Sequence, residues 1–149
     1  MIRVLFVCHG NICRSPMAEY VLKYLVRERS VADQFEIASA ATSTEELGNP
    51  VYPPARRELA NHGIRCDGHH ARQMTSADYD LYDYIIAMDH YNLRNMQRFV
   101  DDDPKQKVSL LMDWTDTPHD VADPWYTGDF RLTWNDIWQG CNDFLGKII

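Results

Sequence analysis

The sequence has no long hydrophobic run, no cluster of basic residues and few cysteines. The opening Met1-Ile-Arg-Val-Leu-Phe-Val-Cys8 is apolar for only a few residues and then turns polar, which is too short for a membrane span or for the core of a secretion signal. We therefore expect no membrane association. Lysine and arginine are scattered, so no stretch of the chain can follow the phosphate backbone of a nucleic acid. We expect no nucleic acid as a partner.

The cysteine content also excludes classes of protein. There are 4 cysteines in 149 residues, too few for a disulfide-dense fold. Cys8 and Cys13 do not have the spacing of a paired zinc knuckle, so no metal site is indicated. A reducing, cytoplasmic setting fits this pattern best. The formal net charge of −7 means that an anionic ligand must be attracted by a local group, because the overall field repels it.

What is present is the composition of an ordinary soluble domain. Hydrophobic residues make up 45% and charged residues 25%, and a chain of this length can bury one good core. We expect a single domain over residues 1–149, and a monomer.

Short apolar runs alternate with segments of helical periodicity. The runs predict strands at residues 2–7, 34–40, 84–88 and 108–112. Helices are predicted to open at Ser15-Pro16, to cover residues 54–62, to follow the capping residues Thr75 and Asp89, and to carry Trp134, Ile137, Trp138, Cys141 and Leu145 on one stripe. Residues 115–128 are predicted to be irregular. This alternation predicts an α/β fold, a three-layer sandwich with a four-stranded parallel sheet flanked by helices on both faces.

Ligands of such folds bind beyond the carboxyl ends of the strands, where the strand order reverses. The turn between the first strand and the first helix reads Cys8-His-Gly-Asn-Ile-Cys-Arg14-Ser15. Backbone N–H groups curling around such a turn form an anion-binding nest, and the helix dipole adds positive potential there. Gly10 and Asn11 are residue types that tolerate the left-handed backbone that a nest requires. The turn is therefore predicted to bind phosphate or another oxyanion.

Three side chains of this turn predict its chemistry. The field of the nest favours the thiolate form of Cys8, which makes this residue the candidate nucleophile. Arg14 offers a planar fork that matches two phosphate oxygens. Ser15 can cap the helix and can donate a hydrogen bond to the sulfur when it becomes a leaving group. A cysteine at the end of a buried strand is often only a small apolar residue, but its neighbours here favour the nucleophile.

The segment Val7-Cys-His-Gly-Asn-Ile-Cys-Arg-Ser-Pro16 resembles the signature of the low-molecular-weight protein tyrosine phosphatases. The resemblance continues through residues 39–43, 48–50, 69–73, 84–89 and 123–124. It implies hydrolysis of phosphotyrosine in proteins or peptides through a phosphocysteine, with no metal or organic cofactor. The phosphate-binding residues that it implies are His9, Gly10, Asn11, Ile12, Cys13, Arg14 and Ser15.

The resemblance also implies residues that hold the loop in shape. Asn11, Ser15, Ser39 and His69 resemble these supporting residues. His70 stands beside His69, so the choice between them rests on the alignment to residues 71–73 alone. Cys13 resembles a cysteine that forms a reversible disulfide with the nucleophile and protects it when it is oxidised.

The wall of the substrate pocket is implied in the same way at Glu45, Trp125 and Tyr126. Many relatives carry Tyr or Trp at the position of Glu45, so the acidic residue weakens the case for an aromatic clamp there. Ile12 resembles the tyrosine-directed members of the family, whereas the phosphoarginine-directed members tend to have Thr.

The leaving oxygen needs a proton donor, and the best candidate is Asp123, which precedes Pro124. The proline forces Asp123 toward an extended backbone and so fixes the direction of its side chain. The resemblance places the general acid of the family in this Asp-Pro motif. His119 and Asp120 are rival donors that lack the proline. Residues 101–103, all aspartate, are interpreted as a solvated loop without a role.

Two other functions remain open. An arsenate reductase on the same fold would share the loop but would need a further cysteine pair, and Cys66 and Cys141 are far apart in sequence. A non-catalytic phosphoprotein-binding module would normally have lost the nucleophile, the arginine or the acid. We therefore predict a cysteine-dependent protein tyrosine phosphatase whose catalytic residues are Cys8, Arg14 and Asp123.

Overall fold

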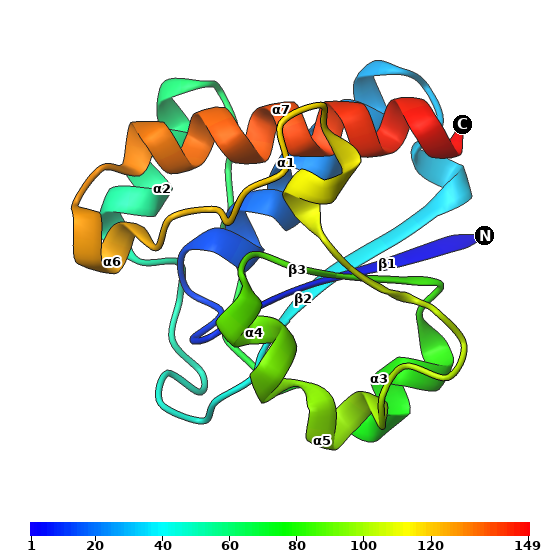
Figure 1. The fold of residues 1–149 in the computed structure, drawn as a ribbon. Helices are drawn as coiled ribbons and strands as arrows, with labels where there is room; N and C mark the ends of the chain where they lie inside the picture. The colour runs from blue at the N-terminus through cyan, green and yellow to red at the C-terminus, as the bar shows by residue number, and fades with distance from the viewer.

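The computed structural model describes all residues from 1 to 149 and contains a four-stranded sheet with helices on both faces (Figure 1). The strands are β1 (Ile2–Cys8), β2 (Phe35–Ala41), β3 (Tyr84–Ala87) and β4 (Val108–Leu110). Their order is β2-β1-β3-β4, and every pairing is parallel. The predicted fold class is confirmed.

Seven helices surround this sheet. They are α1 (Arg14–Glu28), α2 (Pro53–Asn61), α3 (Ser76–Leu81), α4 (His90–Asn95), α5 (Gln97–Val100), α6 (Pro124–Thr127) and α7 (Phe130–Ile148). Helices α1, α2 and α7 cover one face, and α3, α4 and α5 cover the other (Figure 1). Short 3₁₀ turns occur at Ala32–Gln34 and Leu111–Trp114. None of the helices combines the length and the hydropathy that a bilayer crossing needs.

From Val4 onward strand β1 is buried on both faces, which explains the unbroken apolar sequence of that part. Val4, Phe6 and Cys8 belong to the core beneath α1 and α7, whereas Leu5 and Val7 belong to the core on the other face. Because β1 lies between β2 and β3, the chain moves to opposite sides of it in succession. The strand order therefore reverses at β1, and Cys8 stands at its carboxyl end.

Helix α7 packs along α1 through the predicted stripe. Trp134, Ile137, Cys141 and Leu145 are buried, while Trp138 is partly exposed at the edge of the stripe. Gly140 lies on the same buried side. A Cβ added there would fall 2.6 Å from Cγ of Leu111, so only glycine allows the helix to approach this closely.

Both predicted caps occur, but two other local predictions were wrong. Thr75 and Asp89 form capping boxes for α3 and α4. Ser15 does not cap α1, because that helix begins one residue earlier at Arg14, with Cys13 in the capping position. The region predicted as irregular contains α6, a single turn that Pro124 opens and Gly128 closes in a left-handed conformation.

The aspartates at positions 101–103 are more than a solvated loop. All three have positive φ angles, of 49°, 61° and 55°. The carboxylate of Asp103 accepts hydrogen bonds from the hydroxyl of Tyr79 and from the backbone N–H groups of Lys107 and Val108. This carboxylate therefore anchors the start of β4.

Candidate active site

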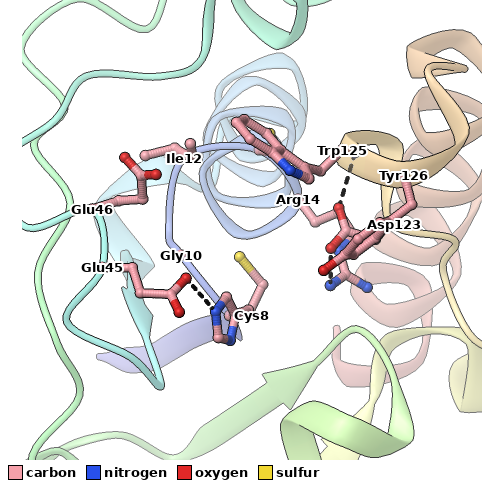
Figure 2. Close-up of a pocket in the computed structure, with 11 residues that line it drawn as sticks. Cys8, Gly10, Ile12, Arg14, Glu45, Glu46, Asp123, Trp125 and Tyr126 are labelled. Atoms are coloured by element: carbon pink, nitrogen blue, oxygen red, sulfur yellow. Dashed lines mark hydrogen bonds and ion pairs between the residues drawn. The ribbon is translucent and has the colours of Figure 1, made fainter.

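The loop between β1 and α1 forms the floor of a cavity of about 370 Å³. Figure 2 shows the side chain of Cys8 at the centre, with Glu45 and Glu46 on one side and Asp123, Trp125 and Tyr126 on the other. The remaining lining residues are His9, Gly10, Ile12, Cys13 and Arg14. Every residue that the sequence placed in the phosphate loop lines this cavity except Asn11 and Ser15, which lie beneath it fully buried.

Asn11 gives the loop its shape. Its φ angle is 60°, in the left-handed region that asparagine tolerates better than most residues. Its Nδ2 donates to the hydroxyls of Ser15, at 2.8 Å, and Ser39, at 2.9 Å, and its Oδ1 accepts from the backbone N–H of Arg72 at 3.2 Å. Gly10, by contrast, is not left-handed. A Cβ added at Gly10 would lie 3.4 Å from Cγ of Glu46, which is an ordinary van der Waals contact.

The hydroxyl of Ser15 faces the sulfur of Cys8 at 3.0 Å. A thiolate has no proton to donate, so in that state Ser15 is the donor and Cys8 the acceptor. Because Asn11 donates to the same hydroxyl, the serine is held in place while its proton points to the sulfur. The position of Ser15 inside α1, which ruled it out as a cap, is the position that brings it to Cys8.

Beneath the loop lies a second layer of hydrogen bonds. Ser39 donates to Oε1 of Glu19 at 2.6 Å, and Nε2 of His69 donates to the backbone carbonyl of Asn11 at 2.8 Å. His69 is buried, whereas His70 is exposed and contacts the carbonyl of Gly48. The structure therefore places His69 against the loop. Glu19 was not predicted, although a glutamate on the buried face of an amphipathic helix is a signal of such a role.

Arg14 is fixed by partners distant in sequence. Its Nη1 donates to Oδ2 of Asp89 at 2.7 Å and to the carbonyl of Val121 at 2.8 Å, and its Nη2 lies 3.5 Å from Oδ2 of Asp123. Nε has no partner within the protein, so it can bind an oxygen of a phosphate. Burial lowers the pKa of Arg14, but the negative charges of Cys8, Asp123 and Asp89 outweigh burial and raise the pKa overall. The guanidinium therefore stays charged.

Asp123 lines the cavity on the side opposite Glu45 and Glu46 (Figure 2). Its Oδ1 accepts from the backbone N–H of Trp125 at 3.1 Å, which caps α6 and fixes the carboxylate (Figure 2). The rival donors point elsewhere. His119 contacts Thr117 and Asp136, and Asp120 contacts His90, and neither rival lines the phosphate cavity.

The rim of the cavity has an aromatic side and an acidic side. Trp125 is 55% exposed and packs on Tyr52, with ring centroids 5.0 Å apart, and Tyr126 is 84% exposed. On the opposite side Glu45 pairs with Nε2 of His9 at 2.7 Å (Figure 2). Glu46 stands beside it. Aromatic rings therefore stand on one side of the rim only.

A model of the family described as low molecular weight phosphotyrosine protein phosphatase matches residues 3–149. The chain belongs to this family. It is 41% identical over 149 residues to the low molecular weight phosphotyrosine protein phosphatase of Rattus norvegicus, covering 97% of this chain and 94% of the relative. The crystal structure of YfkJ from Bacillus subtilis superposes with a TM-score of 0.96 at 37% identity, covering 99% of this chain and 94% of that chain. The crystal structure of DARP, the drosophila arginine phosphatase, superposes with a TM-score of 0.89 at 30% identity, covering 99% of this chain and 98% of that chain.

Like Cys8, the other three cysteines of this low molecular weight phosphatase are free and buried thiols. Burial, and then the charge of Cys8, raises the pKa of Cys13 far above its ordinary value. The two thiols that line the cavity therefore differ: Cys13 stays protonated, and Cys8 has a hydroxyl donor directed at it. No group of three His, Cys, Asp or Glu side chains is placed to hold a metal ion.

Proposed function

We propose that this protein hydrolyses phosphotyrosine in proteins and peptides through a phosphocysteine intermediate, with Cys8, Arg14 and Asp123 as its catalytic residues. The observation that carries the proposal is the sulfur of Cys8, which lies 3.0 Å from a hydroxyl donor and lines the same cavity as the fixed guanidinium of Arg14. Membership of the low molecular weight phosphatase family supports the same reaction.

In the first step the thiolate of Cys8 attacks phosphorus, and the bond from phosphorus to the phenolic oxygen breaks. Asp123, in its protonated form, gives its proton to that oxygen, so tyrosine leaves as the neutral phenol. The backbone N–H groups of the loop and the free side of Arg14 stabilise the charge on the three equatorial oxygens. The carboxyl of Asp123 is already held over the cavity by the N–H of Trp125.

In the second step a water molecule attacks phosphorus and gives its proton to the carboxylate of Asp123. The bond from phosphorus to sulfur breaks, the thiolate of Cys8 is restored and inorganic phosphate leaves. The hydroxyl of Ser15 stabilises the departing sulfur, because it donates to a negative charge. Asn11, Ser39 and His69 support this step indirectly by holding the loop and the serine in place.

The walls of the cavity favour an aryl phosphate. A phenyl ring above the loop would have the ring of Trp125 on one side and the aliphatic side chain of Ile12 on the other (Figure 2). Glu45 and Tyr126 complete the wall. A relative at 30% identity is an arginine phosphatase, so phosphoarginine belongs in any test of substrate range.

The test is a comparison of phosphotyrosine, phosphoserine and phosphoarginine in one peptide sequence, with arsenate reduction measured beside them. We expect release of phosphate from the phosphotyrosine peptide, and the Cys8→Ser variant should release none while still binding phosphate. Hydrolysis of phosphoarginine alone, or arsenate-dependent oxidation of thioredoxin, would overturn the proposal. Binding of the phosphopeptide without release of phosphate by the unmodified protein would favour a binding module instead.

We further infer that the protein is a cytoplasmic monomer that needs no cofactor and binds no nucleic acid. Four free thiols suit a reducing setting. A net charge of −7 repels polyanions, while inorganic phosphate and similar oxyanions are accommodated by the local field of the loop.

A further inference from the structure

A second cavity adjoins the phosphate cavity beside Asp123. Its volume is about 570 Å³, and His9, Arg14, Asp123 and Tyr126 line both cavities. We call it the flanking cleft. A peptide whose phosphotyrosine occupies the first cavity has a neighbouring residue within reach of the flanking cleft, because the two spaces share a wall.

One side of the flanking cleft is aromatic. Tyr91, on α4, is 66% exposed, and Tyr126 is 84% exposed. Exposed rings of this kind pack against the aliphatic stem of a long side chain. The guanidinium of Arg94 lies 5.4 Å from the centroid of the Tyr91 ring, and the ring nevertheless remains 66% exposed.

The carboxylates of the flanking cleft differ in how many of their oxygens already have hydrogen-bond partners. Asp89 is bound to Arg14 and caps α4, and Asp123 faces Arg14 and caps α6. Asp120 has a single partner, the ring of His90 at 2.7 Å, and its side chain is 41% exposed. Its Oδ2 makes no hydrogen bond. Asp120 is therefore the carboxylate in the flanking cleft that a ligand can reach without displacing a structural contact.

The cations that face the flanking cleft do not cancel this charge. Arg14 is buried, and its charge is matched by Asp89 and Asp123. The ring of His9 is paired with Glu45 on the other side of the loop. The flanking cleft therefore has an uncompensated negative charge at Asp120, next to its aromatic side.

We propose that the flanking cleft is a subsite for a lysine or arginine side chain next to the phosphotyrosine of a substrate. The aliphatic stem packs on Tyr91, and the charged end pairs with Asp120. This inference rests on the proposed function, since it names the class of phosphotyrosine substrate that the same site prefers. The net charge of −7 attracts such a basic segment from a distance.

The test uses peptides that contain one phosphotyrosine and otherwise alanine. In each peptide a single alanine is replaced by lysine, leucine or glutamate, at one of the two positions before or the two positions after the phosphotyrosine. We expect lysine at one of these positions to raise kcat/KM about two- to fivefold over leucine, the range of an exposed ion pair, and glutamate to lower it. The preference should fade as salt is added, because exposed charges are screened.

Variants assign the preference to its residues. Asp120→Asn should remove the difference between lysine and glutamate, while Tyr91→Ala should lower kcat/KM for the lysine and leucine peptides alike. Asp116→Asn is the matched control, since Asp116 is exposed on the same segment but does not line the flanking cleft. His90→Gln should strengthen the preference for lysine, because it removes the imidazole that can pair with Asp120 as a cation.

A null result is distinguishable from failure of the proposed function. Hydrolysis of p-nitrophenyl phosphate, which has no flanking residue, should be unchanged in Asp120→Asn and Asp116→Asn. If phosphotyrosine peptides are hydrolysed with no preference at any position, or if Asp120→Asn keeps the preference, this inference is wrong and the proposed function stands. If no phosphotyrosine substrate is hydrolysed at all, it is the proposed function that fails.

Discussion

Asp89 holds Arg14 through a contact of 2.7 Å between Oδ2 and Nη1, across 75 positions of the sequence. The same nitrogen also donates to the carbonyl of Val121. Nη1 is therefore committed to the protein and Nη2 faces Asp123, while Nε is left for the ligand. An arginine fixed in this way loses little side-chain freedom when it binds a phosphate.

We predict that Asp89→Asn weakens phosphate binding and lowers kcat/KM for p-nitrophenyl phosphate by about tenfold, a loss of about 1.4 kcal/mol. Asparagine retains an oxygen that can cap α4, so the helix should survive while the charged contact to Arg14 is lost. Steady-state kinetics and inhibition by phosphate measure the effect. An unchanged inhibition constant for phosphate would show that the pair does not position Arg14.

The loss of activity in Asp123→Asn should depend on how readily the leaving group departs without a proton. Phenyl phosphate needs a proton on its oxygen, so its kcat/KM should fall about 10²- to 10³-fold. p-Nitrophenolate leaves well without a proton, and its rate should fall much less. Asp120→Asn, the neighbouring carboxylate, is the control and should slow neither substrate. Equal slowing of both substrates by Asp123→Asn would remove this residue from the role of acid.

Gly140→Ala should destabilise the fold. The new Cβ would lie 2.6 Å from Cγ of the buried Leu111, and overpacking of this kind costs about 1–3 kcal/mol. Gly146→Ala is the matched control in the same helix, because nothing lies within 4 Å of its added Cβ. We expect it to stabilise the protein by about 0.5–1 kcal/mol, since alanine favours helix. Urea unfolding of both variants measures the difference, and equal stability of the two would contradict the packing argument.

His119 should contribute stability that depends on pH. Its hydrogen bond to the carbonyl of Thr117, and then its contact with Asp136, raise its pKa above the ordinary 6.5. A raised pKa means that the folded state holds the proton more tightly than the unfolded chain does. The contribution is therefore complete below pH 6.5 and is lost as the pH rises through the higher pKa of the folded state.

The measurement is the free energy of unfolding of His119→Gln against pH. The variant should be less stable than the unmodified protein in acid, and the two should converge in mild alkali. Asp136→Asn should show the same trend in a weaker form, because the contact with Thr117 remains. A difference that grows with pH would contradict this assignment.

The parts of the site that follow one another in sequence could be predicted. The apolar residues of β1 indicated a strand and the proline after Ser15 indicated a helix, and the nest between them followed from general geometry. Asn11 was correctly interpreted as a left-handed residue, because asparagine is among the few types that tolerate this backbone. Gly10 does not have a positive φ angle, so the left-handed turn is made by Asn11 and not by the glycine before it.

The contacts that cross the fold could not be predicted. The sequence indicates four strands but does not give their order, and it is the pairing of β3 with β1 that brings the end of β3 beside the phosphate loop. Asp89 was therefore interpreted as a helix cap and not as the partner of Arg14. The turn of α6 was missed because a single helical turn has no periodicity, although Asp123, Pro124 and Gly128 carry its start and stop signals.

Cys8 is the last residue of a strand that pairs with β2 along its whole length, with Ala41 opposite, and the backbone N–H of Thr42 donates to its carbonyl. The backbone of Cys8 is therefore part of the hydrogen-bonded sheet and not of the loop that follows it. This backbone is released only when β1 separates from the edge strand β2, so a small local opening does not displace it. Heat or denaturant should abolish activity and sheet structure in one transition, with no inactive folded form in between.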